Sequence, residues 1–169
     1  MPKLIDTKAA LLANPWVLLP KDCTLETAVA TAEGHLLIPA NLWLAHRQDL
    51  QNTGKQFAVW LDSEQSAHLL ANDLASLPML ALNFPQFMDG RAYSTAVILR
   101  QHYHYKGEIR AIGDVLRDQL FMMKRCGFTT FDLRDTVKLE DATTAFHDFT
   151  TNYQATVEAP EPLFRRRGH

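Results

Sequence analysis

Two polar turns, each between an apolar run and a helical pattern, hold the residues that could do chemistry in this chain. The candidate residues are Asp89, Gly90, Arg91, Gly113, Asp114 and Arg117. Glycine lets the backbone approach a ligand closely, and the start of a helix offers unpaired N–H groups with partial positive charge. Arginine binds anions through two parallel hydrogen bonds. The combination predicts a binding site for an oxyanion such as phosphate, sulfate, sulfite or a carboxylate.

A purely structural role is the alternative for each of these residues taken alone. Aspartate is a good helix N-cap, and glycine is common in turns. Asp114, Arg117 and Asp118 can meet on one helix face, either as an acid–base dyad or as a solvated cap network. The chain has neither a Gly-x-Gly-x-x-Gly nor a Walker A pattern, so no motif supports nucleotide binding.

The cysteine and histidine residues predict neither a metal site nor a bound cofactor. Cys23 and Cys126 lie far apart, and the chain has no Cys-x-x-Cys pair for a zinc ribbon or an iron–sulfur cluster. His102 and His104 are two positions apart at the end of a helical pattern, so their side chains point in different directions. We therefore expect no metal and see no evident cofactor.

The two turns need a scaffold that brings them together, and the hydrophobic pattern predicts one. Apolar runs at residues 57–61 and 79–82 and predicted strands at residues 109–112 and 130–133 alternate with segments of helical periodicity. This alternation favours an α/β domain with a parallel sheet of four or more strands and right-handed crossovers. Half of a (β/α)8 barrel is the alternative to an open sheet, and both folds place the turns at the carboxyl ends of the strands. Two half barrels could close only by dimerising, so a homo-oligomer is one of the alternatives that the sequence allows.

The length of 169 residues suits a single domain, 1–169, with a sizeable core. Within it we expect an irregular N-terminal segment at 1–35, a regular βα core at 56–153 and an irregular basic tail at 159–169. The tail contains Phe164, Arg165, Arg166 and Arg167. It is either a solvated charged end or a docking motif for an acidic partner, with Phe164 as the anchor.

The composition is that of an ordinary globular protein, with 47% hydrophobic and 21% charged residues. The net charge of −2 provides no bulk field that would attract nucleic acid or a membrane surface. No run approaches the ~20 apolar residues of a membrane span. We therefore expect a cytoplasmic protein with no nucleic-acid or membrane partner.

Residues 84–131 resemble a bacterial family of unknown function whose members carry three short motifs. The matching residues are Phe84, Pro85, Phe87, Asp89, Gly90, Arg91, Tyr93 and Ser94, then residues 113–120, then residues 125–128. The ending at residues 162–166 also resembles family endings, and the resemblance covers roughly residues 35–167. Family members are commonly described as oxidoreductases of sulfite reduction, because their genes accompany those of assimilatory sulfite reductase.

This resemblance implies a role in sulfur assimilation. The chain shows neither cluster ligands nor a flavin fingerprint for electron transfer. We therefore expect an accessory or interaction protein of assimilatory sulfite reduction, with sulfite reductase or another sulfur-assimilation protein as its partner. The alternative is a small-molecule enzyme or oxyanion-binding protein, in which Asp114 is a general base or cap while Arg91 and Arg117 hold the oxyanion.

Overall fold

The structure of the protein is a computed structural model that describes residues 3–86, 88–146, 156–157 and 160. The elements, in chain order, are β1 Lys3–Asp6, β2 Val17–Leu18, α1 Leu25–Ala30, β3 His35–Pro39, α2 Ala40–Gln51, β4 Gln56–Leu61, the 3-10 helix η1 Ala67–Leu70, β5 Met79–Phe84, α3 Arg91–Gln101, β6 Glu108–Gly113, the 3-10 helix η2 Arg117–Gln119, α4 Leu120–Cys126, β7 Thr130–Leu133 and α5 Leu139–Ala145.

The strands form one sheet in the order β1-β7-β6-β5-β4-β3-β2. From β2 to β7 the strands are parallel, and each pairs with the strand that follows it in the chain. β1 runs antiparallel to β7 at one edge. A doubly wound sheet reverses its strand order at a switch point, whereas a (β/α)8 barrel adds each strand beside the last. The predicted α/β fold is therefore confirmed, and the strand order is that of the half-barrel alternative.

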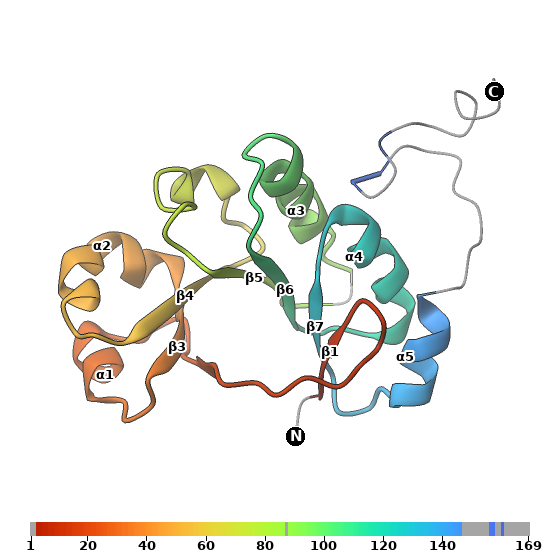
Figure 1. Ribbon diagram of the computed structural model, residues 1–169, viewed down its shortest axis with the longest axis horizontal. Helices are drawn as coiled ribbons and strands as arrows, with labels where there is room; N and C mark the ends of the chain where they lie inside the picture. The colour runs from red at the N-terminus through yellow and green to blue at the C-terminus, as the bar shows by residue number, and fades with distance from the viewer. Residues whose placement is uncertain (1–2, 87, 147–155, 158–159, 161–169) are drawn as a thin grey trace.

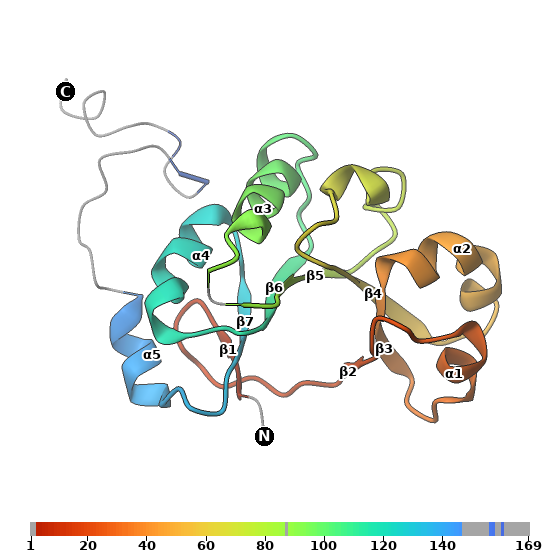
Figure 2. The same cartoon turned by 180° about the vertical axis from the view of Figure 1, so that it is seen from behind.

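Because parallel crossovers share one hand, the helices gather on one side of the sheet. Figure 1 shows α2, α3, α4 and α5 in an arc outside the curved sheet, and Figure 2 shows the same arrangement from behind. We call this side the helix-covered face. It holds the main core, in which Phe84, Phe128 and Phe131 are fully buried. The unbroken apolar runs of the sequence arise because these strands also bury side chains on the other side.

The opposite side, called the open face below, carries a smaller buried cluster. The cluster consists of Leu37, Ala58, Trp60, Met79, Ala81 and Ile112, with Trp16 packed against it. Residues 7–21, called the strap, cross this face between β1 and α1 (Figure 1), and they include the edge strand β2, which pairs with β3. Asn14 Oδ1 accepts a hydrogen bond of 2.9 Å from the Arg110 guanidinium, and Leu19 O accepts one of 3.1 Å from the Trp60 indole. The strap thus covers part of the side that a complete barrel would enclose.

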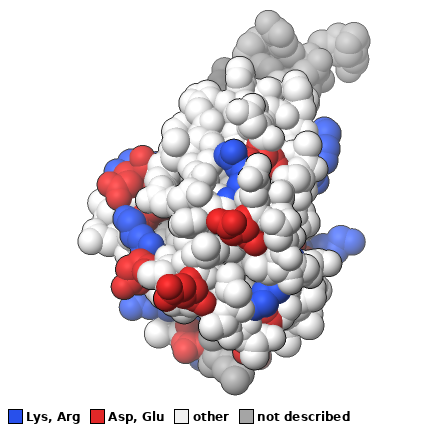
Figure 3. Space-filling view, turned by 90° about the vertical axis from the view of Figure 1, so that its left-hand side faces the viewer, with Lys and Arg blue, Asp and Glu red and all other residues white. Residues whose placement is uncertain are grey.

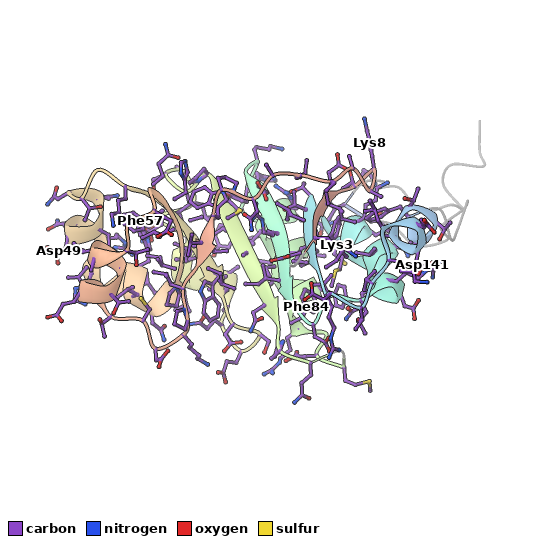
Figure 4. All side chains as sticks on the ribbon, turned by 90° about the horizontal axis from the view of Figure 1, so that it is seen from below. Lys3, Lys8, Asp49, Phe57, Phe84 and Asp141 are labelled. Carbon is purple, nitrogen blue, oxygen red and sulfur yellow. The ribbon has the colours of Figure 1, made fainter. Side chains whose placement is uncertain are left out.

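The strap ends at the carboxyl ends of the strands. In Figure 4, Phe57 marks the start of β4 and Phe84 marks the end of β5. The strap meets β6 in mid-strand at Arg110, and its last residue, Lys21, bonds Asp62 immediately after β4. The strap therefore joins the N-terminal part of the chain to the edge where the polar turns lie.

The N-terminal 35 residues are less irregular than the sequence predicts. β1, β2 and α1 all lie in this segment. β1 gains its hydrogen bonds by pairing with β7, with Lys3 opposite Leu133 and Asp6 opposite Thr130. Such long-range pairing leaves little trace in the local pattern of a four-residue strand, which explains the difference.

The helical spacing across residues 67–77 also gives less helix than it predicts. A 3-10 turn, η1, is followed by successive turns instead of an α-helix. Asp73 is buried there and bonds Arg47 of α2 at 2.7 and 2.8 Å, which fixes this segment against α2. Asn72 and Asp73 also compete with helix formation through their short polar side chains.

Part of the predicted C-terminal structure lies outside the described residues. α5 ends at Ala145. The βα core that the sequence predicts extends to residue 153, and its last part, residues 147–153, lies outside the described residues. The docking motif at residues 164–167 lies wholly outside the described part of the chain. None of the helices in the described part is both long enough and apolar enough to cross a membrane.

Candidate functional site

The two polar turns follow adjacent strands at the same edge of the sheet. Phe84, the last residue of β5, pairs with Gly113, the last residue of β6. The Asp114 N–H donates a 2.7 Å hydrogen bond to Phe84 O, which ties the start of the second turn to the end of β5. The first turn begins five residues after Phe84, at Asp89. Both turns therefore lie at the carboxyl ends of the strands, where the sequence places them.

In the first turn, Arg91 is held by its own neighbours. Its Nε and Nη2 donate to the two oxygens of the Asp89 carboxylate at 3.0 and 2.6 Å. Its Nη2 also donates to Ser63 Oγ, after β4, at 3.0 Å. Hydrogen bonds from Arg91, and then from Ser63, hold the pKa of Asp89 well below its usual range. Gly90 has φ −90°, so this turn does not need the left-handed backbone of glycine.

In the second turn, Gly113 has a structural requirement of its own. Its φ of +92° is left-handed, and a Cβ there would lie 2.5 Å from both Asn83 Oδ1 and Phe84 O. The close approach that glycine permits is therefore to the chain's own strand β5. Asp114 bonds the Arg134 guanidinium, after β7, at 2.8 Å.

Arg117 lies in the 3-10 turn η2, which leads into α4. Its Nη1 donates to Asp118 Oδ1 at 3.2 Å, and its side chain is 35% exposed. The sequence leaves an acid–base dyad and a solvated cap network open for Asp114, Arg117 and Asp118. In the structure Asp114 pairs with Arg134, and Arg117 pairs with Asp118.

The bonds of the two turns thus run to different neighbours. The first turn is linked towards β4 through Ser63, and the second is linked towards β7 through Arg134. Arg91 already binds a carboxylate with two hydrogen bonds, so an oxyanion would have to displace Asp89 from it. A shared anion site between Gly90 and Gly113 stays a prediction.

A third polar group lies at the same edge, and it includes Lys21, which the sequence analysis does not place there. Lys21 Nζ donates to Asp62 at 2.5 Å and to Glu64 at 3.1 Å. Asp62 also accepts from Asn83 Nδ2 at 3.1 Å and from the Ser63 N–H at 2.9 Å. Burial acts to raise the pKa of Asp62, but the bonds from Lys21, Asn83 and Ser63 outweigh it and lower the pKa. Asp62 thus connects the strap to β5.

Sequence reasoning places Asp62 at a strand end, as a helix cap or a ligand-binding residue, and gives no functional role to Lys21 or Trp60. The partner of Lys21 is 41 residues away, and no short-range pattern encodes it. Trp60 has a usable signal. It lies between Val59 and Leu61, which pack in the helix-covered core, and side chains alternate along a strand. A bulky aromatic residue on the other face, one position before a strand ends, can be recognised as a candidate for the binding edge.

Two histidines and a tyrosine form a small cluster, and Cys126 has little reactive character. His68 Nδ1 and the Tyr103 hydroxyl share a hydrogen bond, and the His102 ring packs edge-on against Tyr103. Burial raises the pKa of the Cys126 thiol, which keeps it protonated and unreactive. Across the described ranges, no group of three His, Cys, Asp or Glu side chains is placed to hold a metal ion.

Charges are mixed over the side of the molecule that carries α1 and α2. Figure 3 shows acidic and basic side chains interspersed there, without separation into patches of one sign. The ion pairs at the strand ends follow the same pattern, since Arg91, Arg134 and Lys21 each contact a carboxylate. The edge of the sheet is therefore polar but locally balanced in charge.

Comparison with known proteins gives one family match. A family model described as "Bacterial protein of unknown function (DUF934)" matches residues 58–164, a range that begins within β4 and includes both polar turns and α5. Neither a curated protein nor a solved structure matches the chain.

Proposed function

The chain belongs to the bacterial family DUF934, and we propose that it is an accessory protein of assimilatory sulfite reduction rather than an independent catalyst. Its partner in this proposal is sulfite reductase or another protein of sulfur assimilation. The proposal starts from the resemblance that the motifs at residues 84–94, 113–120 and 125–128 carry, and from the gene association described for that family.

The observation that carries the proposal is the pairing of the strand-end charges. Arg91 is bonded to Asp89, and Arg134 is bonded to Asp114. A catalytic group that transfers protons near neutral pH needs a pKa close to that pH. The Asp89 pKa instead lies far below it, because Arg91 and Ser63 stabilise the carboxylate. Such balanced ion pairs suit the polar rim of a contact surface better than general acid–base chemistry.

A genetic experiment tests the accessory role directly. Deleting the gene should slow growth on sulfate as the sulfur source and leave growth on cysteine unchanged. The protein should also co-purify with the reductase from cells grown on sulfate. Unchanged growth on sulfate together with unchanged reductase activity in the deletion strain would contradict the proposal.

Complementation then asks whether the basic tail is the contact. A gene with Arg165, Arg166 and Arg167 each changed to Glu should fail to restore growth on sulfate, because an acidic partner would repel the new charges. The matched control changes each arginine to Lys, which keeps the positive charge and should restore growth. If the Glu variant restores growth fully, the tail is not the docking motif.

Oxyanion binding is the second candidate, and the exposure of two guanidinium groups favours it. The side chains of Arg91 and Arg134 are 62% and 55% exposed, so an anion in solution can reach them despite their carboxylate partners. Sulfate should then raise the melting temperature of the natural protein more than that of Arg91→Leu or Arg134→Leu. Equal sulfate shifts in all three proteins would remove this candidate.

A further inference from the structure

A pocket lies between the strap and the carboxyl ends of three neighbouring strands. Residues 18–21 of the strap form one wall, and Trp60 of β4, Asn83 of β5 and Ile112 of β6 form the other. Its volume is about 340 Å³, at the lower end of the range for small-molecule sites. In barrels of parallel strands this end of the sheet is where ligands bind. The pocket is separate from the two polar turns that the sequence singles out.

The base of the pocket is apolar and held in place. Trp60 is 6% exposed and Ile112 is 3% exposed, so only the edges that line the pocket are open. The Trp60 indole donates to Leu19 O, which fixes the ring against the strap. Leu18, 50% exposed, adds a further apolar side chain from the strap. A flat ring is the ligand shape that this aromatic and aliphatic lining favours.

The polar end of the pocket offers one donor and one acceptor. An ammonium group has three donors, and Lys21 uses one for Asp62 and one for Glu64. Asn83 donates through Nδ2 to Asp62, and its Oδ1 accepts no hydrogen bond from the described part of the chain. Gly113 leaves room for that oxygen, since a Cβ there would lie 2.5 Å from it.

The charges at this end sum to −1. The single positive charge of Lys21 faces the two carboxylates of Asp62 and Glu64. An anionic ligand would therefore meet repulsion from these carboxylates, and a cationic amidinium has no acceptor for the third donor of Lys21. A neutral group that both accepts from Lys21 and donates to Asn83 has neither disadvantage.

We propose that this pocket binds a small flat molecule with a neutral amide edge, such as an aromatic carboxamide or a lactam ring. The ring lies along Trp60 and Ile112, and the amide accepts from Lys21 and donates to Asn83 Oδ1. Because residues 18–21 line one side of the pocket and β4, β5 and β6 line the other, the ligand also links the strap to these three strands. This assigns the strap a function in binding as well as in covering the open face.

Three probes with the same ring and different charge test the proposal. The full chain is titrated with benzamide, benzoate and benzamidine, which are neutral, anionic and cationic at pH 7. Binding is followed by ¹H–¹⁵N spectra, in which the Trp60 indole and residues 18–21 report on the pocket. Benzamide should bind with a dissociation constant on the order of 1 mM, as expected for so small a ligand, and at least about fivefold more tightly than the other two.

Variants locate the site and provide controls. Trp60→Leu and Lys21→Met should each weaken benzamide binding, by about five- to tenfold. Trp43→Leu is the matched control for Trp60→Leu, because Trp43 is 3% exposed but belongs to the helix-covered core. Binding by Trp43→Leu should be unchanged. Lys21 is 56% exposed, so Lys21→Met keeps the test valid if the tryptophan variants do not fold.

Each other outcome overturns the proposal. Tighter binding of benzoate or benzamidine shows that one charge dominates the pocket, and equal binding of all three shows that the amide edge is not recognised. Shifts that do not include the Trp60 indole place the ligand elsewhere. No shifts with any probe up to 20-fold above the expected constant mean that the pocket is not a site for this class of ligand.

Discussion

The two faces of the sheet are built from the same strands but are closed in different ways. The helix-covered face packs side chains such as Leu80 and Phe131 against helices, and both are fully buried. The open face has a small cluster and is covered by the strap, which is held by individual hydrogen bonds such as Arg110 to Asn14. Hydrophobic packing is non-directional, whereas hydrogen bonds fix positions.

This difference separates stability from recognition. The helix-covered face should supply most of the free energy of folding, because it removes most of the apolar surface from water. The open face instead leaves a pocket and keeps polar groups near it, and Asp62 and Lys21 join the strap to the strand ends. A binding site is more easily accommodated on the face that contributes less to the core.

The largest expected loss in the free energy of unfolding is at β5, where two adjacent residues point to opposite faces of the sheet. Leu80 is 0% exposed on the helix-covered face, and Met79 is 1% exposed on the open face. Leu80→Ala should reduce the free energy of unfolding by about 4–5 kcal/mol and Met79→Ala by about 2–3 kcal/mol, because the strap can relax into the smaller cavity. Urea denaturation measures both. Equal losses would show that the strap packs as rigidly as the helices do.

The second largest loss in the free energy of unfolding is expected at Gly113, at the carboxyl end of β6. Gly113→Ala should cost about 1–3 kcal/mol, because its φ is left-handed and the new Cβ would collide with Phe84 O. Gly34→Ala is the control, since a Cβ there meets nothing within 4 Å, and it should change the free energy of unfolding by less than about 0.5 kcal/mol. Thermal unfolding of both variants decides the matter. A tolerated Gly113→Ala would mean that β5 and β6 can move apart at this end.

The helix-covered face was largely predictable from sequence, and particular strands show why. The apolar run at 57–61 and the predicted strand at 130–133 correspond closely to β4 Gln56–Leu61 and β7 Thr130–Leu133. The run at 57–61 is continuous and bounded by Gln56 and Asp62, and Phe131 and Leu133 alternate with polar residues, so the local pattern identifies both strands. The choice between an open sheet and a half barrel was not determined, because strand order depends on contacts between distant residues.

The strap and its pocket were not predictable, for a physical reason that Lys21 makes clear. Its bond to Asp62 spans 41 residues, and neither residue belongs to a motif. Asp89 and Arg91 lie two positions apart, so their pairing could have been considered from spacing, but that pairing uses the donors that an anion site would need. Local sequence thus located the edge where binding groups gather, and it did not show how those groups are paired.

The attachment of the strap can be tested through Asn14. Arg110 is 3% exposed and donates to Asn14 Oδ1, so Asn14→Ala leaves a buried guanidinium N–H without its partner. The loss should be about 1–2 kcal/mol, and amide exchange should increase in residues 7–21 before it increases elsewhere. Asn41→Ala is the control, because it removes only an exposed bond to Gln65. Unchanged exchange in the strap would show that other contacts hold it.

Asp132 on β7 should make a smaller contribution to folding stability, and this contribution should depend on pH. Burial raises the pKa of Asp132, and the nearby Arg110 only partly opposes this. Its Oδ1 is buried without a hydrogen-bond partner within the described residues. A raised folded pKa means that the folded protein disfavours the carboxylate, so stability is lost as pH rises through the unfolded and then the folded pKa.

Asp132→Asn removes this charge and should therefore raise the melting temperature at pH 7. The gain should shrink as the pH falls towards about 4, near the ordinary pKa of aspartate, where the carboxyl group of the natural protein becomes protonated. Melting curves of both proteins from pH 4 to pH 8 give the comparison. A gain that is the same at every pH would mean that the charge of Asp132 is not what destabilises the fold.

The smallest effect is expected at Arg117, and it addresses the anion site that the sequence predicts. Arg117 Nη1 bonds Asp118 at 3.2 Å, and Asp118 is 75% exposed, so this ion pair lies at the surface. Loss of this ion pair in Arg117→Leu should therefore contribute less than about 1 kcal/mol, and that contribution should not depend on added sulfate. If Arg117 instead holds an anion between the two turns, sulfate should stabilise the natural protein more than the variant. Thermal melts of both proteins with and without sulfate distinguish the two results, and a sulfate shift that the variant loses would restore the shared anion site.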